Sequence, residues 1–298
     1  MISIKNKSNI FLNETLTIKP DYLNHPFVSG NKLRKLKYNL LIAKQLNYSV
    51  LLTFGGAYSN HIAAVAAAGH EFGFKTIGVI RGDELSAKIS ENPTLTFAKN
   101  QGMEFYFISR ETYKEKTTET FIDALKIKFG DFYLIPEGGT NNLAVKGCEE
   151  ILTRDDNSFD YICCPVGTGG TISGLINSSN NSQKILGFPS LKGDFLREEI
   201  GKFAQNKHWD LIQDYHLGGY AKINTDLISF INWFKATYHI PLDPIYTGKM
   251  MFGIFDLLKQ GYFPKGSKIL AIHTGGLQGI EGMNKILRRK NSPIINLD

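Results

Sequence analysis

The sequence predicts an α/β protein built on mainly parallel, twisted β-sheets with helices packed against them. Short runs rich in β-branched and aromatic residues alternate with longer segments in which apolar residues recur every three or four positions. This alternation is typical of strand–helix–strand units, in which successive strands lie parallel. The length of 298 residues and the 42% of hydrophobic residues suffice for two modest domains or one large one.

The expected elements alternate along the chain. The strand-like runs are Val50–Phe54, Thr76–Ile80, Phe105–Ile108, Phe132–Ile135, Tyr161–Val166, Lys184–Phe188 and Lys268–His273. The helical segments, with apolar residues at i, i+3 and i+4, are Lys32–Leu46, Ser59–Phe72, Thr117–Phe129, Leu143–Leu152, Thr171–Asn177, Thr225–Tyr238 and Thr247–Gln260. The polar run at 177–182 leads directly into a strand-like run, so it is predicted to be a turn and not a linker between domains.

The composition indicates a globular protein in a reducing compartment. Charged residues make up 21% of the chain, and the excess of 34 Lys+Arg over 28 Asp+Glu suits a small anionic ligand without specifying one. Cys148 stands apart from the adjacent Cys163 and Cys164, so the cysteines form neither a disulfide framework nor a metal-ligand spacing. We expect no metal site.

The sequence also bears on location and macromolecular partners. Lysine and other polar residues interrupt the apolar residues of segment 1–19, which therefore lacks the apolar core of a signal peptide. No stretch approaches the roughly 20 apolar residues of a membrane span. The short basic cluster at 285–290 has no interleaved aromatic residues that could stack on bases. We therefore expect a cytoplasmic protein that binds neither membranes nor nucleic acids.

The first chemically suggestive segment is a glycine turn that opens a cation-rich helix. Gly30 precedes Asn31 and Lys32, and Arg34, Lys35 and Lys37 follow within the same helical pattern. A run of charges of this kind is usually a solvated helix face. A lysine just after a tight turn can instead face a cavity, where burial or a neighbouring cation favours the free, nucleophilic amine.

Two further glycine turns each join a strand to a helix. One contains Gly55, Gly56, Ser59, Asn60 and His61, and the other contains Gly167, Thr168, Gly169, Gly170 and Thr171. Either is explained by ordinary helix capping, but backbone N–H groups at a helix start also bind anions. The second turn has isoleucine where a dinucleotide-binding Gly-x-Gly-x-x-Gly turn has its third glycine, and it lacks the Gly-Lys-Ser/Thr ending of a Walker turn.

The last two segments contain Tyr246, within Asp243–Lys249, and Thr274, within Ile272–Gly276. Each alone is explained as a turn or helix start. The joint occurrence of all five segments in one chain indicates a functional site.

Together the five segments resemble the D-cysteine desulfhydrase and 1-aminocyclopropane-1-carboxylate deaminase family. This family belongs to the tryptophan-synthase-β-like, fold type II class of pyridoxal-phosphate enzymes. The resemblance extends from Lys19 to about Gly279. It implies a larger cofactor-binding domain at 1–47 and 146–298, with a smaller α/β domain at 48–145 inserted into it. By analogy with the family, we also expect a homodimer.

The resemblance implies a role for each motif residue. Lys32 holds pyridoxal phosphate as a Schiff base and later accepts a proton, and Asn60 bonds the phenolic oxygen of the cofactor. Thr274 lies by the pyridine nitrogen. The phosphate is held by Lys35, Gly167, Thr168, Gly169, Gly170 and Thr171. The substrate side comprises Ser59, Asn60, His61, Tyr246 and Tyr220, of which Ser59 and the two tyrosines are expected to act in catalysis with Lys32. The alternative for His61 is a structural histidine packed in its helix.

The sequence departs from the family pattern on the substrate side. Tyr58 replaces the usual glutamine, and Ala221 begins a segment that replaces Gly-Leu-Pro. Thr247 follows Tyr246, where the deaminase branch has a glutamate that keeps the pyridine nitrogen protonated. Without an anion there, the protonated ring is less favourable and the cofactor is a weaker electron sink.

These departures favour one reaction within the family. A weaker electron sink favours β-elimination from D-cysteine or a related small amino acid, giving pyruvate, ammonia and sulfide. The alternative is opening of 1-aminocyclopropane-1-carboxylate to 2-oxobutyrate and ammonia. A non-catalytic pyridoxal-phosphate-binding protein is a further alternative, whereas an oxidoreductase is disfavoured by the missing third glycine.

Overall fold

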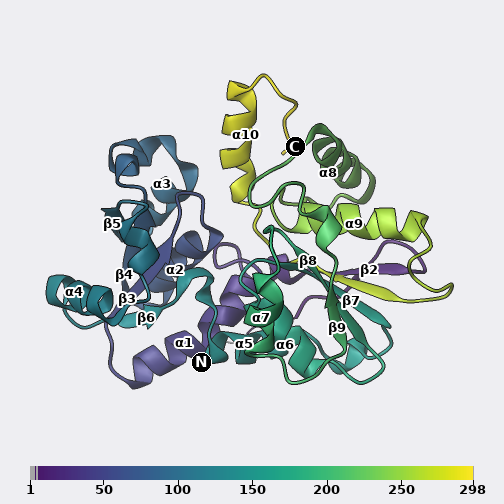
Figure 1. Ribbon diagram of the computed structural model, residues 1–298, viewed down its shortest axis with the longest axis horizontal. Helices are drawn as coiled ribbons and strands as arrows, with labels where there is room; N and C mark the ends of the chain where they lie inside the picture. Colours follow the sequence, from purple (N-terminus) through teal and green to yellow (C-terminus); the bar gives the residue numbers. More distant parts are fainter. Residues whose placement is uncertain (1–3, 5, 298) are drawn as a thin grey trace.

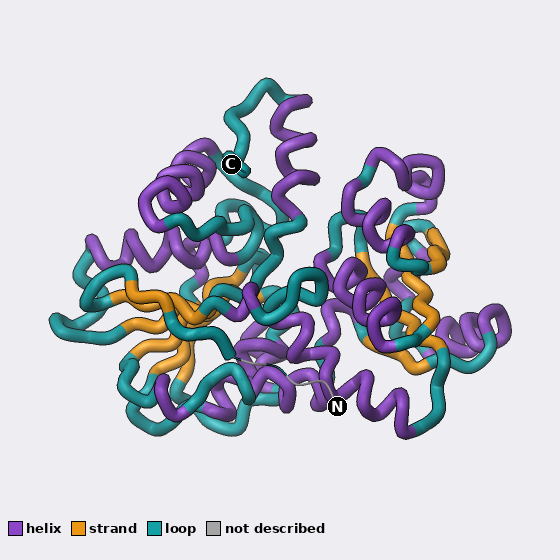
Figure 2. The backbone as a smooth tube through the Cα atoms, turned by 180° about the vertical axis from the view of Figure 1, so that it is seen from behind, coloured by secondary structure: helices purple, strands orange, loops and turns teal. Residues whose placement is uncertain are grey.

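The computed structural model describes residue 4 and residues 6–297, and its strands form two sheets in two lobes (Figures 1 and 2). The four-stranded sheet lies on the left of Figure 1, and the six-stranded sheet lies on the right. The expected α/β architecture with mainly parallel sheets is confirmed. Within the described residues, no helix combines the length and the apolar character needed to cross a bilayer.

The larger sheet has the strand order β1-β2-β10-β7-β8-β9. Only β1 runs antiparallel to its neighbour, and the other neighbouring pairs are parallel. The strands are β1 (Ile10–Phe11), β2 (Leu16–Lys19), β7 (Tyr161–Val166), β8 (Lys184–Pro189), β9 (Trp209–Leu211) and β10 (Ile269–Ile272). Helices cover both faces, as a mainly parallel sheet requires.

The cysteine pair in β7 shows how the two faces of this sheet are buried. Successive side chains of a strand point to opposite faces. Cys163 packs with α8 (Thr225–Tyr238), α9 (Thr247–Lys259) and α10 (Gly279–Arg289), whereas Cys164 packs with α5 (Asn142–Glu149), α6 (Gly170–Ser178) and α7 (Phe195–Gly201). Two separate apolar cores therefore flank the sheet.

The smaller sheet has the order β5-β4-β3-β6 and is parallel throughout. Its strands are β3 (Val50–Gly55), β4 (Lys75–Arg81), β5 (Glu104–Ile108) and β6 (Tyr133–Ile135), with α2 (Asn60–Phe72), α3 (Pro93–Asn100) and α4 (Glu119–Phe129) packed around it. The helix α1 (Asn31–Gln45) also contributes Leu33, Leu36 and Leu40 to this core. Helix α1 thus links the lobes, and the expected division at residues 48 and 145 stays a prediction.

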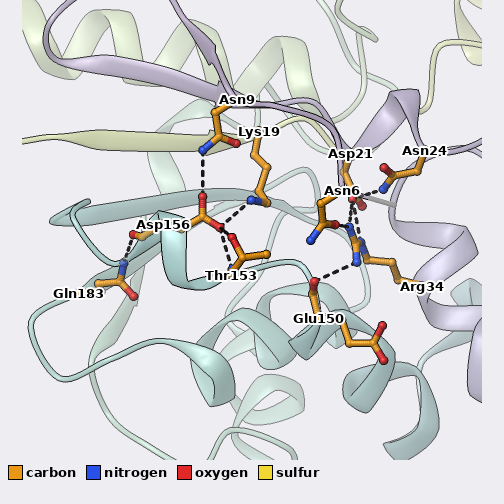
Figure 3. A network of polar contacts seen from close by, with 10 residues as sticks. All are labelled: Asn6, Asn9, Lys19, Asp21, Asn24, Arg34, Glu150, Thr153, Asp156 and Gln183. Carbon is orange, nitrogen blue, oxygen red and sulfur yellow. Dashed lines mark hydrogen bonds and ion pairs between the residues drawn. The ribbon is translucent and has the colours of Figure 1, made fainter. Parts of the chain in front are cut away.

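A buried polar network fixes the orientation of α1 (Figure 3). The guanidinium group of Arg34, 1% exposed, donates from Nε to Asp21 at 2.7 Å and from Nη1 to the carbonyl of Glu150 at 3.0 Å. In the same network Lys19 pairs with Asp156 at 2.6 Å. Removing one partner of a buried pair leaves an uncompensated charge, so the contacts of Arg34 hold α1 in one position against the larger lobe.

A close backbone approach fixes where α1 begins. Gly30 has φ +61°, and a β-carbon at this residue would lie 2.0 Å from the carbonyl oxygen of Thr274, which follows β10. The same oxygen accepts a hydrogen bond from the amide of Asn31 at 3.2 Å. Glycine is required at position 30 because any side chain would overlap this carbonyl group.

We predict that Gly30→Ala lowers the free energy of unfolding by about 3 kcal/mol or more, since steric overlap adds to the strain of positive φ. Gly73→Ala is the matched control. Its φ is +78°, but no atom lies within 4 Å of the added carbon, so only about 1 kcal/mol should be lost. Urea unfolding of both variants measures the difference, and equal losses would contradict the proposed contact.

Candidate active site

A cavity of about 560 Å³ opens between the two lobes. Its walls come from turns that directly follow β3, β4, β6, β7 and β10, together with the start of α1. The carboxyl ends of parallel strands are the usual place for a ligand in α/β proteins. Of the residues predicted for the site, the cavity is lined by Lys32, Lys35, Ser59, Asn60, His61, Gly167, Thr168, Gly169, Thr171, Tyr220, Tyr246 and Thr274.

Lys32 lies in the first turn of α1 and faces this cavity. Burial, and to a lesser extent the cation of Lys35, lower the pKa of Lys32 to about 7, while the carboxylate of Asp243 opposes the shift. An ammonium group taken out of water loses its proton more readily. A large share of Lys32 is therefore a free amine at neutral pH, as a nucleophile or general base requires.

Lys35 lies one turn further along α1 and is 2% exposed. Its Nζ donates to the carbonyl of Gly138 at 3.0 Å, to Thr140 Oγ1 at 3.0 Å and to Thr168 Oγ1 at 3.3 Å. Burial lowers the pKa of Lys35. The acceptors are neutral oxygen atoms, so this cation is favourably placed to receive an anion.

The turn before α6 meets Lys35 from the other side of the cavity. Gly169, with φ +85°, is the N-cap of α6. Gly170 does not line the cavity itself, but a β-carbon there would lie 3.2 Å from Lys35 Nζ. The hydroxyl of Thr171 accepts from the side-chain Nδ2 of Asn31 at 2.8 Å. Backbone donors at the start of this helix and the ammonium group of Lys35 together could hold an anion.

Ser59 and Asn60 stand at the start of α2. The hydroxyl of Ser59 caps this helix by accepting from the amide of Ile62 at 3.3 Å, and it still has a hydrogen to donate. Asn60 lies beside Gly276, because a β-carbon at Gly276 would be 2.9 Å from Asn60 Nδ2. The expected helix cap and the expected ligand-binding turn therefore coincide in one segment.

His61 lines the cavity, but it is only 2% exposed, and a hydrogen bond to Thr53 fixes its ring. The hydroxyl of Thr53 donates to the carbonyl of Ile135, so it accepts from His61 Nε2 at 2.8 Å. Burial and the cations of Lys32 and Lys35 hold the pKa of His61 well below its usual range. A neutral ring anchored in this way favours a packing role over proton transfer.

Two tyrosines form a further part of the cavity wall. The rings of Tyr246 and Tyr220 meet edge to face, with centroids 6.3 Å apart. Burial, reinforced by neighbouring groups, raises the pKa of Tyr246 well above its usual value, and burial also raises the pKa of Tyr220. Both hydroxyls stay protonated at neutral pH and can donate hydrogen bonds into the cavity.

Thr274 lies at the end of the cavity where Gly30 meets the turn after β10. The neighbouring His273 steadies this turn, since its Nε2 bonds to the carbonyl of Pro241 at 2.7 Å and its Nδ1 accepts from the amide of Gly275 at 3.3 Å. Because Nδ1 accepts a hydrogen bond, Nε2 carries the proton. His273 is thus a positioning residue that sequence analysis did not identify.

The structure corrects the expected placement of Thr247. Its hydroxyl points to the buried carboxylate of Asp243, to which it donates at 2.7 Å, and Thr247 does not line the cavity. Asp243 also accepts from the amides of Ile245, Tyr246 and Thr247, so it caps the start of α9. The carboxylate of Asp243 therefore lies behind the tyrosine wall of the cavity. Hydrogen bonds from residues 245–247 engage both of its oxygens.

Sequence analysis missed a second set of cavity residues, which follow β4 and β6. Glu137 and Gly138 line the cavity, and Thr140 bonds Lys35. The signal was a third glycine turn, Gly138-Gly139-Thr140, directly after a predicted strand. Arg81, at the end of β4, also lines the cavity and lies over the ring of Tyr113 at 5.8 Å. An arginine at the end of a strand carries no comparable sequence signal.

Known proteins have sequences similar to most of this chain. The chain is 30% identical over 294 residues to the bifunctional D-cysteine desulfhydrase/1-aminocyclopropane-1-carboxylate deaminase of Arabidopsis thaliana, covering 89% of this chain and 73% of the relative. It is 28% identical over 290 residues to the 1-aminocyclopropane-1-carboxylate deaminase of a Bradyrhizobium species, covering 88% and 86%.

The fold is likewise shared with a solved structure. A crystal structure of an ACC deaminase homologue superposes with a TM-score of 0.80 at 29% identity, covering 92% of this chain and 88% of that one. The sequence model of the pyridoxal-phosphate dependent enzymes matches residues 2–275. That match spans the helix with Lys32, the three glycine turns and the tyrosine wall. The chain therefore belongs to the pyridoxal-phosphate dependent enzyme family.

Proposed function

We propose that this enzyme removes the β-substituent and the amino group of a small amino acid, with D-cysteine as the representative substrate. The products would be pyruvate, ammonia and sulfide. The observation that carries the proposal is the meeting of Lys32, the start of α2 and the two tyrosines in one cavity. Opening of 1-aminocyclopropane-1-carboxylate to 2-oxobutyrate and ammonia is the second candidate, because the relatives carry both names.

The residues present fit pyridoxal phosphate. Lys35, Thr168 and the start of α6 would hold its phosphate, because Lys35 is a buried cation with neutral acceptors only. Lys32, with a pKa of about 7, would attach to its aldehyde. When bound, this cofactor withdraws electrons from bonds at the α-carbon of an amino acid, which allows one of them to break.

Lys32 also supplies the base that the reaction needs. As a free amine, Lys32 would accept the proton of the substrate α-carbon. Loss of that proton is followed by breakage of the bond between the β-carbon and sulfur, and sulfide leaves with the electron pair. The released 2-aminoacrylate takes up water and gives pyruvate and ammonia.

The remaining residues would orient the substrate. The Ser59 hydroxyl and the backbone N–H groups at the start of α2 would bind its carboxylate, since helix starts favour anions. Protonated Tyr246 and Tyr220 would donate hydrogen bonds to the departing sulfur. Tyr58, which lies 2.6 Å from where a β-carbon at Gly282 would stand, fills the cavity on the side of α10.

The preference for elimination rests on the carboxylates of the cavity. Among its described lining residues, the only carboxylate is that of Glu137, which binds the hydroxyl of Tyr113 at 2.9 Å and lies 3.4 Å from Lys116. Asp243 is engaged by α9. A ring nitrogen beside neutral Thr274 would stay largely unprotonated, which supports expulsion of a β-leaving group over the deeper delocalisation of ring opening.

We predict that Lys32→Ala abolishes both turnover and covalent attachment of the cofactor. The purified variant should lack the visible absorbance of the protein-bound cofactor, and borohydride treatment of the native protein should label Lys32. Lys37→Ala is the control, because Lys37 pairs with Glu150 at 2.6 Å and does not line the cavity. Labelling of Lys35 or Lys37 in native protein would contradict the assignment.

The lowered pKa of Lys32 gives a pH prediction. Only the unprotonated amine attacks the aldehyde, so attachment of pyridoxal phosphate to cofactor-free protein should accelerate about tenfold per pH unit below 7 and level off above it. Stopped-flow absorbance from pH 5.5 to 10 measures this rate. A rate that keeps rising toward pH 10 would indicate an ordinary lysine.

The order of substrate preference can be tested with assays for pyruvate and 2-oxobutyrate. D-cysteine, L-cysteine, D-serine, β-chloro-alanine and aminocyclopropane carboxylate would each be supplied to fully loaded enzyme. Pyruvate should form from a β-substituted amino acid faster than 2-oxobutyrate forms from the cyclopropane. The reverse order would favour the deaminase reaction, and the absence of both products would favour a non-catalytic binding protein.

A further inference from the structure

Lys249 is a buried lysine whose hydrogen-bond partners are backbone carbonyls. It lies in α9 three residues after Tyr246 and is 1% exposed. Its Nζ donates to the carbonyl oxygens of His216 and Gly219, each at 2.8 Å. In the described part of the chain no carboxylate forms an ion pair with it. Burial lowers its pKa to about 8, and only the charge of Asp243 opposes the shift.

A buried ammonium group without a carboxylate is costly, and an apolar residue of similar size would be cheaper for stability. The segment that it binds is also strained. Leu217 and Ala221 have φ of +52° and +55°, and Gly218 and Gly219 between them are also positive. Positive φ raises the conformational energy of residues other than glycine. Contacts with other parts of the protein are therefore needed to stabilise this segment.

The two acceptors of Lys249 occupy matching positions in this segment. The carbonyl of His216 also accepts from the amide of Gly219, and the carbonyl of Gly219 accepts from the amide of Lys222. The turns 216–219 and 219–222 are therefore consecutive. In each of them, the carbonyl oxygen that accepts the hydrogen bond closing the turn also accepts a hydrogen bond from Lys249. Tyr220 lies between them, 43% exposed, with its ring against Tyr246.

We propose that Lys249 is a positioning residue that ties the segment 216–222 to α9 and so holds Tyr220 beside Tyr246 at the cavity. Helix α9 thereby positions both tyrosines. Tyr246 is its N-cap residue, and Tyr220 is held through the hydrogen bonds of Lys249. The consequence for the substrate rests on the proposed function, whereas the consequence for the segment itself does not.

The test compares Lys249→Met, which keeps the length and removes the donors, with Lys249→Arg and with Lys259→Met. Lys259 is the matched control, because it is exposed at the last turn of the same helix. Hydrogen exchange of loaded enzyme should show the amides of Gly219 and Lys222 exchanging about tenfold faster in Lys249→Met only, since a charge-assisted bond is lost. Cofactor content and the melting temperature should not fall.

Kinetics supply the second readout. The kcat for D-cysteine should fall about tenfold in Lys249→Met with a smaller change in KM, because Tyr220 is proposed to bond the departing sulfur, and Lys249→Arg should recover part of the loss. Adding Tyr220→Phe to Lys249→Met should have little further effect, because the tyrosine is already displaced.

Unchanged exchange of the two amides in Lys249→Met would overturn the proposal, as would fully additive kinetic effects of the two substitutions. If the enzyme turned over no amino acid at all, the proposed function would fail. The exchange measurement would then still decide whether Lys249 holds the segment.

Discussion

The backbone of Gly30 lies so close to the carbonyl of Thr274 that no side chain fits between them. This contact joins the first helix to the turn after the last strand, and the rest of the site depends on it. Lys32 and Lys35 occupy the next turns of α1, so their direction follows from where that helix begins. Arg34 fixes the same helix through Asp21 on its other side. The direction of the two lysines and the packing of the lobes are therefore set by one helix.

The buried positive charge of the site has no anionic partner among the described residues. Lys35 is a buried cation bonded to a carbonyl and two hydroxyls, and the start of α6 adds a partial positive charge. Such a cluster is unfavourable until an anion enters it. A phosphate group would supply that anion, so cofactor binding and stability of the folded chain should be thermodynamically linked. The negative groups nearby, Asp243 and Glu137, are already engaged by other donors.

Sequence patterns predicted the parts of the molecule that have strong local signals. All seven strand-like runs and all seven helical segments form within a few residues of their expected bounds. The missed elements are the strands β1, β2 and β9, with two to four residues each, and the helices α3, α7 and α10. Cavity-lining residues beside glycine turns were identified because glycine marks close backbone approach. Lys249, His273 and Asp243 were not, because their roles depend on contacts between segments distant in the sequence.

The order of strands in the larger sheet has a consequence for how the chain reaches this structure. Strand β10 lies between β2 and β7, although it is the last strand made. Until it is present, β2 has no parallel partner and the two halves of the sheet stay unjoined. The four strands of the smaller sheet are consecutive in the sequence, so that lobe can assemble first during synthesis. Completion of the cavity is thus a late folding event, reached only when Thr274 closes on Gly30.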